Sequence, residues 1–234
     1  MRAPSIPLPR MADGFSPPAC NPRRDMIYCT WFIHSKMQAE VPMRQLMMLH
    51  TLDKIPDVPP TPGFFIRTWT PGEEESWLEI VRCGLSAPDA GIETWNSAIL
   101  GRENLNPLTD TFFVCREESG EPVATITGYV HPDGLGDIHM VACKYDARGN
   151  RLGEVMLSHA MKKLKAEMPG ENRLVELTTD DFRVPAVVGY LRGGFHPVLY
   201  DEGMEERWRA LCDKIGIHGV EMLTESGKPA GIVL

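Results

Sequence analysis

The sequence has no apolar segment long enough to cross a membrane as a helix. Such a helix needs about 20 consecutive, mainly apolar residues, whereas the apolar run at 26–33 is followed by His34 and Lys36. The Pro- and Arg-rich residues before that run are unlike a secretory signal peptide. We therefore expect a soluble, cytoplasmic protein that has no membrane partner.

Positive charge is also scarce. The chain has 24 Lys and Arg residues against 32 Asp and Glu residues, so its formal net charge is −8. Because a protein that binds nucleic acid needs a basic surface to neutralise phosphates, this balance argues against nucleic acid as a partner. It still allows a local basic pocket for a phosphorylated ligand, and it suits a cationic substrate.

Closely spaced metal ligands and paired cysteines are lacking as well. None of the six cysteines forms a C-x-x-C pair, and the seven histidines show no zinc-ligand spacing. We therefore expect neither a metal site nor a disulfide framework. Cys115 and Cys143 lie in strand-like runs, where buried free thiols are expected in a reducing compartment.

Composition divides the chain into four stretches. Residues 1–42 are broken by prolines and are expected to be disordered, or to precede a later translation start at one of the methionines 43, 47 and 48. Residues 43–62 form a Pro-rich segment that should be extended. Residues 63–216 are expected to be the folded domain, and 217–234 a C-terminal tail whose pattern predicts no element.

Within 63–216, strand-like runs alternate with amphipathic helical segments. Helix 71–85 should begin at an N-cap Thr70 with Pro71 in the first position. Short polar turns make the three middle strands antiparallel neighbours. The expected strands are 63–69, 111–116, 122–130, 135–143, 173–178 and 195–200, and the expected helices are 71–85, 92–100, 153–168, 183–192 and 205–214. This order predicts an α/β fold, a mixed sheet flanked by helices.

The chemistry of the chain is concentrated between the strand that ends at Cys143 and the helix that begins near Gly153. The first turn of a helix has unpaired N–H groups and a partial positive charge, and it therefore attracts anions. Gly149 lets a ligand approach the backbone closely, and Arg148 and Arg151 add charge-assisted hydrogen bonds. This arrangement predicts a phosphate or diphosphate site.

The segment 148–153, RGNRLG, resembles the R/Q-x-x-G-x-G/A motif of the GNAT acyltransferases, which holds the diphosphate of acetyl-CoA. Arg151 occupies the place of the middle glycine. A second segment, 185–195, resembles the N-x-x-A-x-x-L-Y-x-x-x-G-F pattern of the same family. Its residues Ala186, Tyr190, Gly194 and Phe195 fall in register, and Arg183 stands where asparagine is usual. The resemblance covers about residues 63–214.

The resemblance implies a GNAT fold, in which two parallel central strands diverge, one ending near Cys143 and the other starting near Arg173. The pantetheine arm of acetyl-CoA would lie between them and pair with the backbone. The residues implied in cofactor binding are Val141, Ala142, Cys143, Arg148, Gly149, Asn150, Arg151, Leu152 and Gly153.

Two residues are the first candidates for catalysis. The resemblance implies that Tyr190 donates a proton to the departing CoA thiolate, as a phenol can at neutral pH. A general base must deprotonate the ammonium form of the acceptor. His139 is our first candidate, because its spacing from Val141 predicts that both lie on one face of the strand. Asp137, Glu176 and a chain of water molecules are the alternatives.

The sequence thus predicts an N-acetyltransferase in which a primary amine of a small molecule or peptide attacks acetyl-CoA directly in a ternary complex. A homodimer is compatible with this prediction, and the acceptor is not identified. One alternative is a GNAT-fold protein that binds CoA or a partner without catalysis, which Arg151 suggests. The other is an unrelated α/β nucleotide binder.

Overall fold

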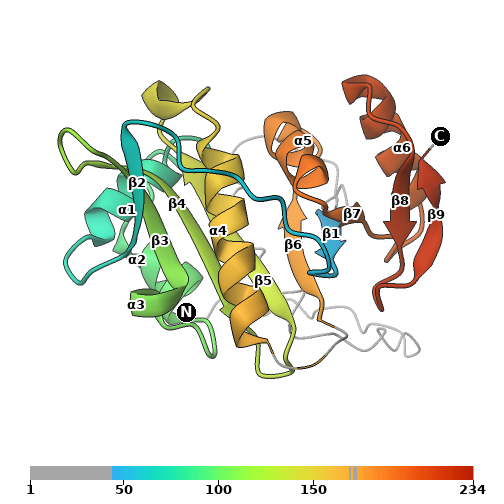
Figure 1. Cartoon of the computed structure of the whole chain (residues 1–234), viewed down its shortest axis with the longest axis horizontal. Coiled ribbons are helices and arrows are strands. Elements are labelled where there is room, and N and C mark those ends of the chain that lie inside the picture. Colours follow the sequence, from blue (N-terminus) through green and yellow to red (C-terminus); the bar gives the residue numbers. More distant parts are fainter. Residues whose placement is uncertain (1–43, 169, 171–172, 234) are drawn as a thin grey trace, which may run out of the picture. The chain divides into compact units, whose positions relative to one another are not determined.

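The computed structural model describes residues 44–168, 170 and 173–233. They belong to the compact unit Glu40–Leu234, and the unit Met1–Ala39 lies outside the described residues. The prediction of disorder for 1–42 also concerns residues outside the described part of the chain. A mixed sheet has the strand order β2-β3-β4-β5-β6-β1-β7, and β8 pairs with β9 in a second sheet (Figure 1). The expected mixed α/β sheet flanked by helices is confirmed.

The elements have the following bounds. The strands are β1 (Leu46–His50), β2 (Phe64–Thr68), β3 (Thr111–Arg116), β4 (Pro122–Val130), β5 (Gly136–Cys143), β6 (Val175–Thr179), β7 (His196–Pro197), β8 (Val220–Leu223) and β9 (Pro229–Val233). The helices are α1 (Glu74–Val81), α2 (Ile92–Trp95), α3 (Pro107–Asp110), α4 (Leu152–Glu167), α5 (Val184–Arg192) and α6 (Met204–Ile215). A π-helical turn, Asn96–Leu100, continues α2, and a 3-10 turn, Tyr145–Ala147, precedes α4.

Most of these elements agree with the sequence prediction. Strands β3, β4 and β5 are antiparallel neighbours, as expected from their short connections. The strand predicted at 195–200 is shorter than expected, because β7 contains only His196 and Pro197, which pair with β1. Pro197 has no N–H to donate. The N–H of Val198 still bonds to the carbonyl of Met47 in β1, and the N–H of Leu199 bonds to the carbonyl of Leu223 in β8.

Strand β1 was not predicted. It lies between β6 and β7 and is antiparallel to β6, from Leu46↔Thr179 to His50↔Val175. All five of its residues are buried, so the run lacks the alternation that marks a half-exposed strand. The β8–β9 hairpin lies in the stretch for which no element was predicted.

Helix α1 begins at Glu74, so the N-cap expected at Thr70 is wrong. The carboxylate of Glu73 accepts hydrogen bonds from the N–H and the hydroxyl of Thr70, at 2.9 and 2.7 Å. Arg67 donates to the same carboxylate at 2.7 Å. Thr70 therefore belongs to the turn that precedes α1, and Glu73 occupies the N-cap position instead.

Helices cover both faces of the sheet. Helix α4 lies in front of it in Figure 1 and packs Leu157, Met161 and Leu164 into the main apolar core. On the other face, α1 and α2 contribute Trp77 and Trp95 to a second apolar cluster. Each face of the sheet therefore has its own packed layer.

The Pro-rich segment that connects β1 to β2 runs across α4 (Figure 1). Ser158 of α4 donates to the carbonyl of Pro56 at 2.8 Å, and Thr61 donates to the carbonyl of Asn150 at 2.9 Å. The segment is therefore attached both to the helix and to the loop before it.

Candidate functional site

Strands β5 and β6 pair only at their first residues, Gly136↔Val175 and Asp137↔Glu176. Beyond these pairs, β5 stays hydrogen-bonded to β4 as far as Cys143, and β6 stays paired with β1 as far as Thr179. The two parallel neighbours therefore diverge toward their C-terminal ends. Among the described residues, no strand pairs with the edge of β5 that faces this gap, so its backbone can pair with an extended ligand.

A bulge in β5 lies beside the gap. The register with β4 shifts there, and Met140 has a φ of 51°, which is uncommon for a residue other than glycine. The extra residue breaks the alternation of side chains: Met140 packs with the cluster under α1 and α2, and Val141 packs with the core under α4. The expectation that His139 and Val141 share a face is therefore wrong, because His139 Nε2 lies 3.1 Å from the carbonyl of Ala98, after α2.

The loop after β5 leads directly into the N-terminus of α4, a 16-residue helix that begins at Leu152. The positive end of this helix faces the loop and favours an anion. Gly149 has a φ of 84°, and no atom lies within 4 Å of a Cβ built at Gly149 or Gly153. The space over the helix start is therefore open.

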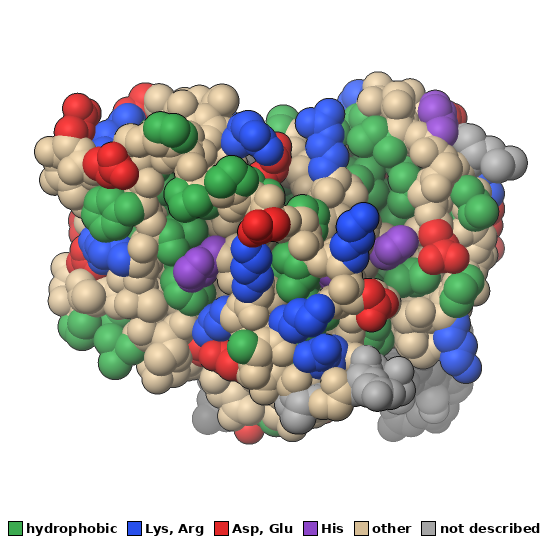
Figure 2. All heavy atoms as spheres, in the orientation of Figure 1, with side chains coloured by type: hydrophobic (Ala, Val, Ile, Leu, Met, Phe, Trp, Pro, Cys, Tyr) green, Lys and Arg blue, Asp and Glu red, His purple; other side chains and the backbone are tan. Residues whose placement is uncertain are grey.

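Basic side chains accompany this helix although the chain as a whole is acidic. Lys162, Lys163 and Lys165 lie on α4, and Figure 2 shows Lys and Arg side chains gathered over the face where α4 runs. These lysines lie in the C-terminal half of α4, where Lys162 pairs with Asp57 at 2.5 Å and Lys163 with Asp110 at 2.8 Å, so they do not form part of the anion site at the helix start.

Arg151 is the N-cap of α4 and has a left-handed backbone, with φ 57° and ψ 20°. This is the conformation that glycine adopts most easily, and glycine stands there in the family motif. The guanidinium pairs with Glu154 at 2.6 Å, and the Arg151 side chain is 66% exposed. It therefore lies in solvent and is not packed into the loop.

Replacing Arg151 separates backbone strain from the ion pair. Arg151→Ala loses the pair with Glu154 and keeps the left-handed strain, whereas Arg151→Gly loses the pair and relieves the strain. We expect the glycine variant to exceed the alanine variant by about 1 kcal/mol in free energy of unfolding. Urea unfolding measures the difference, and equal stabilities would show that the backbone at 151 is unstrained.

Two arginines, one beside each of the diverging strands, contact the segment that follows α1. Arg148 lies 4.2 Å from the ring centroid of Tyr145 and donates to the carbonyls of Cys143 at 3.3 Å and Cys83 at 2.6 Å. Arg183, before α5, donates to the carbonyl of Gly84 at 2.9 Å. An anion at the start of α4 would compete with these carbonyls for Arg148.

Tyr190 of α5 packs against the core under α4, with its ring centroid 6.1 Å from that of Phe195. Burial raises its pKa to about 12, although Arg183 acts to lower it. The phenol therefore stays protonated at neutral pH and can donate. Cys143 is a thiol at neutral pH for a similar reason, because burial raises its pKa to about 11.

His139 is neutral at pH 7. Burial lowers its pKa from 6.5 to about 4, although Asp137 acts to raise it. Its Nε2 is within hydrogen-bonding distance of the Ala98 carbonyl, which requires the N–H on that nitrogen and leaves Nδ1 as the acceptor. A base with so low a pKa holds a proton weakly.

This pKa shift makes stability depend on pH. Because the folded-state pKa lies below the unfolded value, the stabilisation is complete above about pH 6.5 and is lost as the pH falls toward 4. We expect His139→Gln, which keeps a donor for Ala98, to lose less stability over this interval, by on the order of 2 kcal/mol. Urea unfolding at pH 7.0, 5.5 and 4.5 tests this; parallel curves for both proteins would contradict it.

A cluster that sequence analysis found only in part lies where the strands begin to diverge. Asp137 and Glu176 were considered as bases, but His131 was not. It follows the last residue of β4, and its N–H bonds to the carbonyl of Leu135 in the turn that leads to β5. The tight turn at Asp133-Gly134 was the available signal, because it brings His131 back beside β5.

Comparison with known proteins agrees with this geometry. The model of the acetyltransferase (GNAT) family matches residues 75–195. A GCN5-related N-acetyltransferase from Sphaerobacter thermophilus is 26% identical with a TM-score of 0.55, and the match covers 65% of this chain and 48% of that one. A GCN5-related N-acetyltransferase from Kribbella flavida is 18% identical with a TM-score of 0.40, covering 67% and 55% of the two chains.

A tandem GNAT protein from the clavulanic acid biosynthesis pathway is 17% identical with a TM-score of 0.49, covering 65% of this chain and 50% of that one. The chain thus spans about half the length of these structures. No curated protein matches. Among the described residues, no helix is both long and apolar enough to span a bilayer.

Proposed function

Because the chain belongs to the acetyltransferase (GNAT) family, we propose that it transfers an acetyl group from acetyl-CoA to a primary amine, with residues 63–216 as the catalytic domain. The observation that carries this proposal is the divergence of β5 and β6 next to the N-terminus of α4. The divergence leaves an unpaired edge on β5, and the N-terminus of α4 offers an anion site. Together they suit a ligand that has an amide-bearing arm and a diphosphate.

In this proposal the diphosphate binds the backbone amides of the loop and the first helical turn, 149–153, and Arg148 adds charge. The pantetheine arm pairs with the backbone of Val141, Ala142 and Cys143 along the open edge of β5. Arg151 binds through its backbone, since its side chain is turned to Glu154.

The chemistry proposed is direct attack by the amine in a ternary complex. Holding both substrates in place supplies most of the rate advantage, and Tyr190 protonates the departing thiolate. The raised pKa of Cys143 supports a route without an acyl-cysteine intermediate. The acidic composition supports a cationic small-molecule or peptide acceptor, and the free cysteines among the described residues suit the reducing cytoplasm.

The test is a titration with acetyl-CoA, followed by detection of free thiol with a panel of amines. We expect acetyl-CoA to bind and at least one amine to release CoA. Binding without thiol release across the panel would favour the alternative of a family member without catalysis. A thermal shift with ATP or NAD and none with CoA would favour a nucleotide binder and contradict the proposal.

A further inference from the structure

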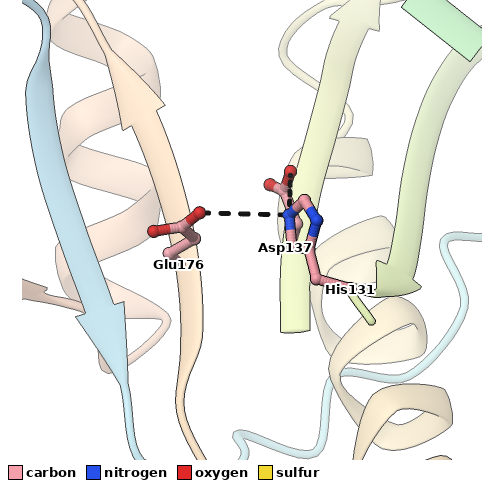
Figure 3. A group of neighbouring side chains, drawn as sticks. All are labelled: His131, Asp137 and Glu176. Atoms are coloured by element: carbon pink, nitrogen blue, oxygen red, sulfur yellow. Dashed lines mark ion pairs between the residues drawn. The ribbon is translucent and has the colours of Figure 1, made fainter. Parts of the chain in front are cut away.

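Three ionisable side chains meet where β5 and β6 begin to diverge (Figure 3). Nε2 of His131 lies 3.4 Å from Oδ2 of Asp137 and 4.0 Å from Oε1 of Glu176. The two carboxylates come from the last pair of residues that joins the strands. The cluster therefore stands at the closed end of the gap.

The cluster lies on the face of the sheet opposite α4. Ile138 and Leu177, which follow Asp137 and Glu176 in their strands, both pack in the core under α4. Because successive side chains of a strand point to opposite faces, the two carboxylates point away from α4. Tyr190, in contrast, packs on the α4 side, so the gap separates it from the cluster.

The three side chains are screened from water but within reach of a small solute. His131 is 16% exposed, Asp137 15% and Glu176 25%. Burial acts to raise the pKa of Asp137, but the neighbouring His131 and His139 outweigh it and hold that pKa below its ordinary value. Asp137 is therefore a carboxylate at neutral pH.

A buried hydroxyl adjoins the carboxylates. Tyr129 lies opposite Asp137 in β4, is only 1% exposed, and has its ring centroid 4.8 Å from that of His131. Its Oη makes no well-formed hydrogen bond among the described residues, and Asp137 is the carboxylate toward which it can donate. Its oxygen can therefore accept a hydrogen bond from a bound N–H donor while its own proton is directed to Asp137.

We propose that Asp137, Glu176 and Tyr129 bind the ammonium group of a primary amine acceptor, with His131 beside them as the proton acceptor. This rests on the proposed acyltransferase function and assigns the residues that would bind its acceptor. Three acceptor oxygens match the three donors of a primary ammonium. Arg102 is an electrostatic neighbour of Tyr129. Its single positive charge and the two carboxylates together carry a net charge of about −1, which one ammonium balances.

A divalent cation is the competing occupant, since the ligand atoms of His131, Asp137 and Glu176 all lie within 4.8 Å of one another. A metal would use these three groups and not the neutral Tyr129 hydroxyl, because hard cations prefer carboxylates, carbonyls and water. An ammonium can also donate to the hydroxyl oxygen.

The reaction then balances as follows. The ammonium gives one proton to the Asp137–His131 pair, and the neutral amine attacks the thioester carbon from the cluster side of the sheet. The C–N bond forms and the C–S bond breaks. Tyr190, on the α4 side, protonates the thiolate, and the second proton lost by the nitrogen restores the phenol. One proton is released to solvent for each amide formed.

The experiment follows the His131 ring nitrogens by NMR in ¹⁵N-labelled full-length protein with CoA, while n-butylammonium is added. Tetramethylammonium, which has the same charge but no N–H, is the matched probe. We expect His131 signals to shift with n-butylammonium and to stay within error with tetramethylammonium. A parallel titration with Mn²⁺ tests the metal.

Conservative variants locate the binding. Glu176→Gln and Asp137→Asn should each weaken n-butylammonium binding at least about tenfold, the loss expected when a charged partner is removed, and Tyr129→Phe about fivefold. Glu75→Gln, which changes an exposed carboxylate paired with Arg82, should leave binding unchanged. Amide spectra report whether each variant is folded. Glu176→Gln is the decisive variant, because Glu176 is partly exposed and its substitution should disturb the fold least.

The outcomes separate the two proposals. If CoA fails to bind, the proposed function fails, whatever the His131 signals do. If CoA binds, the ammonium subsite is overturned by an unchanged His131 signal, by equal shifts with tetramethylammonium, or by Mn²⁺ broadening that Glu176→Gln removes. Equal affinity of wild type and Glu176→Gln for n-butylammonium would also overturn it.

Discussion

Tyr190→Phe is expected to lower kcat about 100-fold or more, the usual contribution of a positioned proton donor. Acetyl-CoA affinity should change by less than about 0.5 kcal/mol, or roughly twofold. The reason is that the partly buried phenol packs against the core and keeps its proton, with a pKa raised to about 12, so removing the oxygen deletes a donor and little packing. Single-turnover thiol release and calorimetry with acetyl-CoA measure the two quantities.

Tyr200→Phe is the matched control. It makes the same chemical change at a hydroxyl that donates to the carbonyl of Gln45, the residue before β1. We expect kcat to be unaffected. Wild-type turnover in Tyr190→Phe would remove Tyr190 from the mechanism and leave the thiolate to be protonated by solvent.

Gly153→Asp should move stability and binding in opposite directions. No atom lies within 4 Å of the added Cβ, and a carboxylate in the first turn of α4 stabilises the helix by about 0.3–1 kcal/mol. The same charge would repel a diphosphate at that helix end. We expect acetyl-CoA affinity to fall at least tenfold, about 1.4 kcal/mol, with an unchanged or slightly higher melting temperature.

Gly153→Ala is the control for this substitution, since it adds only the Cβ and keeps every backbone donor. It should bind acetyl-CoA within about threefold of wild type, or 0.7 kcal/mol. If Gly153→Asp binds acetyl-CoA as well as Gly153→Ala does, the diphosphate is not at the start of α4.

The sequence sufficed to predict the central elements, because their patterns are strong. Helix α4 has regularly spaced apolar residues, and the turns between β3, β4 and β5 are short and polar. It did not predict β1, because a fully buried strand lacks alternation. It misplaced the start of α1, because the Glu73 contact with Thr70 depends on Arg67, which belongs to the preceding strand.

For the candidate site, local sequence predicts the loop before α4 and Tyr190, since both belong to short motifs. The face on which His139 lies was mispredicted, because a single bulge residue at Met140 shifts the alternation in β5. The cluster of His131 with Asp137 and Glu176 was only partly found, because Glu176 lies on β6 and only the register of the sheet brings it beside Asp137. Such sites depend on tertiary pairing more than on any local pattern.

Hydrogen–deuterium exchange with and without acetyl-CoA tests the central claim most directly, because it reads the backbone amides that are proposed to hold the ligand. We expect acetyl-CoA to protect peptides covering 141–143 and 149–153 and to leave the β8–β9 hairpin unchanged. Tight binding of acetyl-CoA with no added protection in either stretch, or with protection confined to other parts of the chain, would contradict the account.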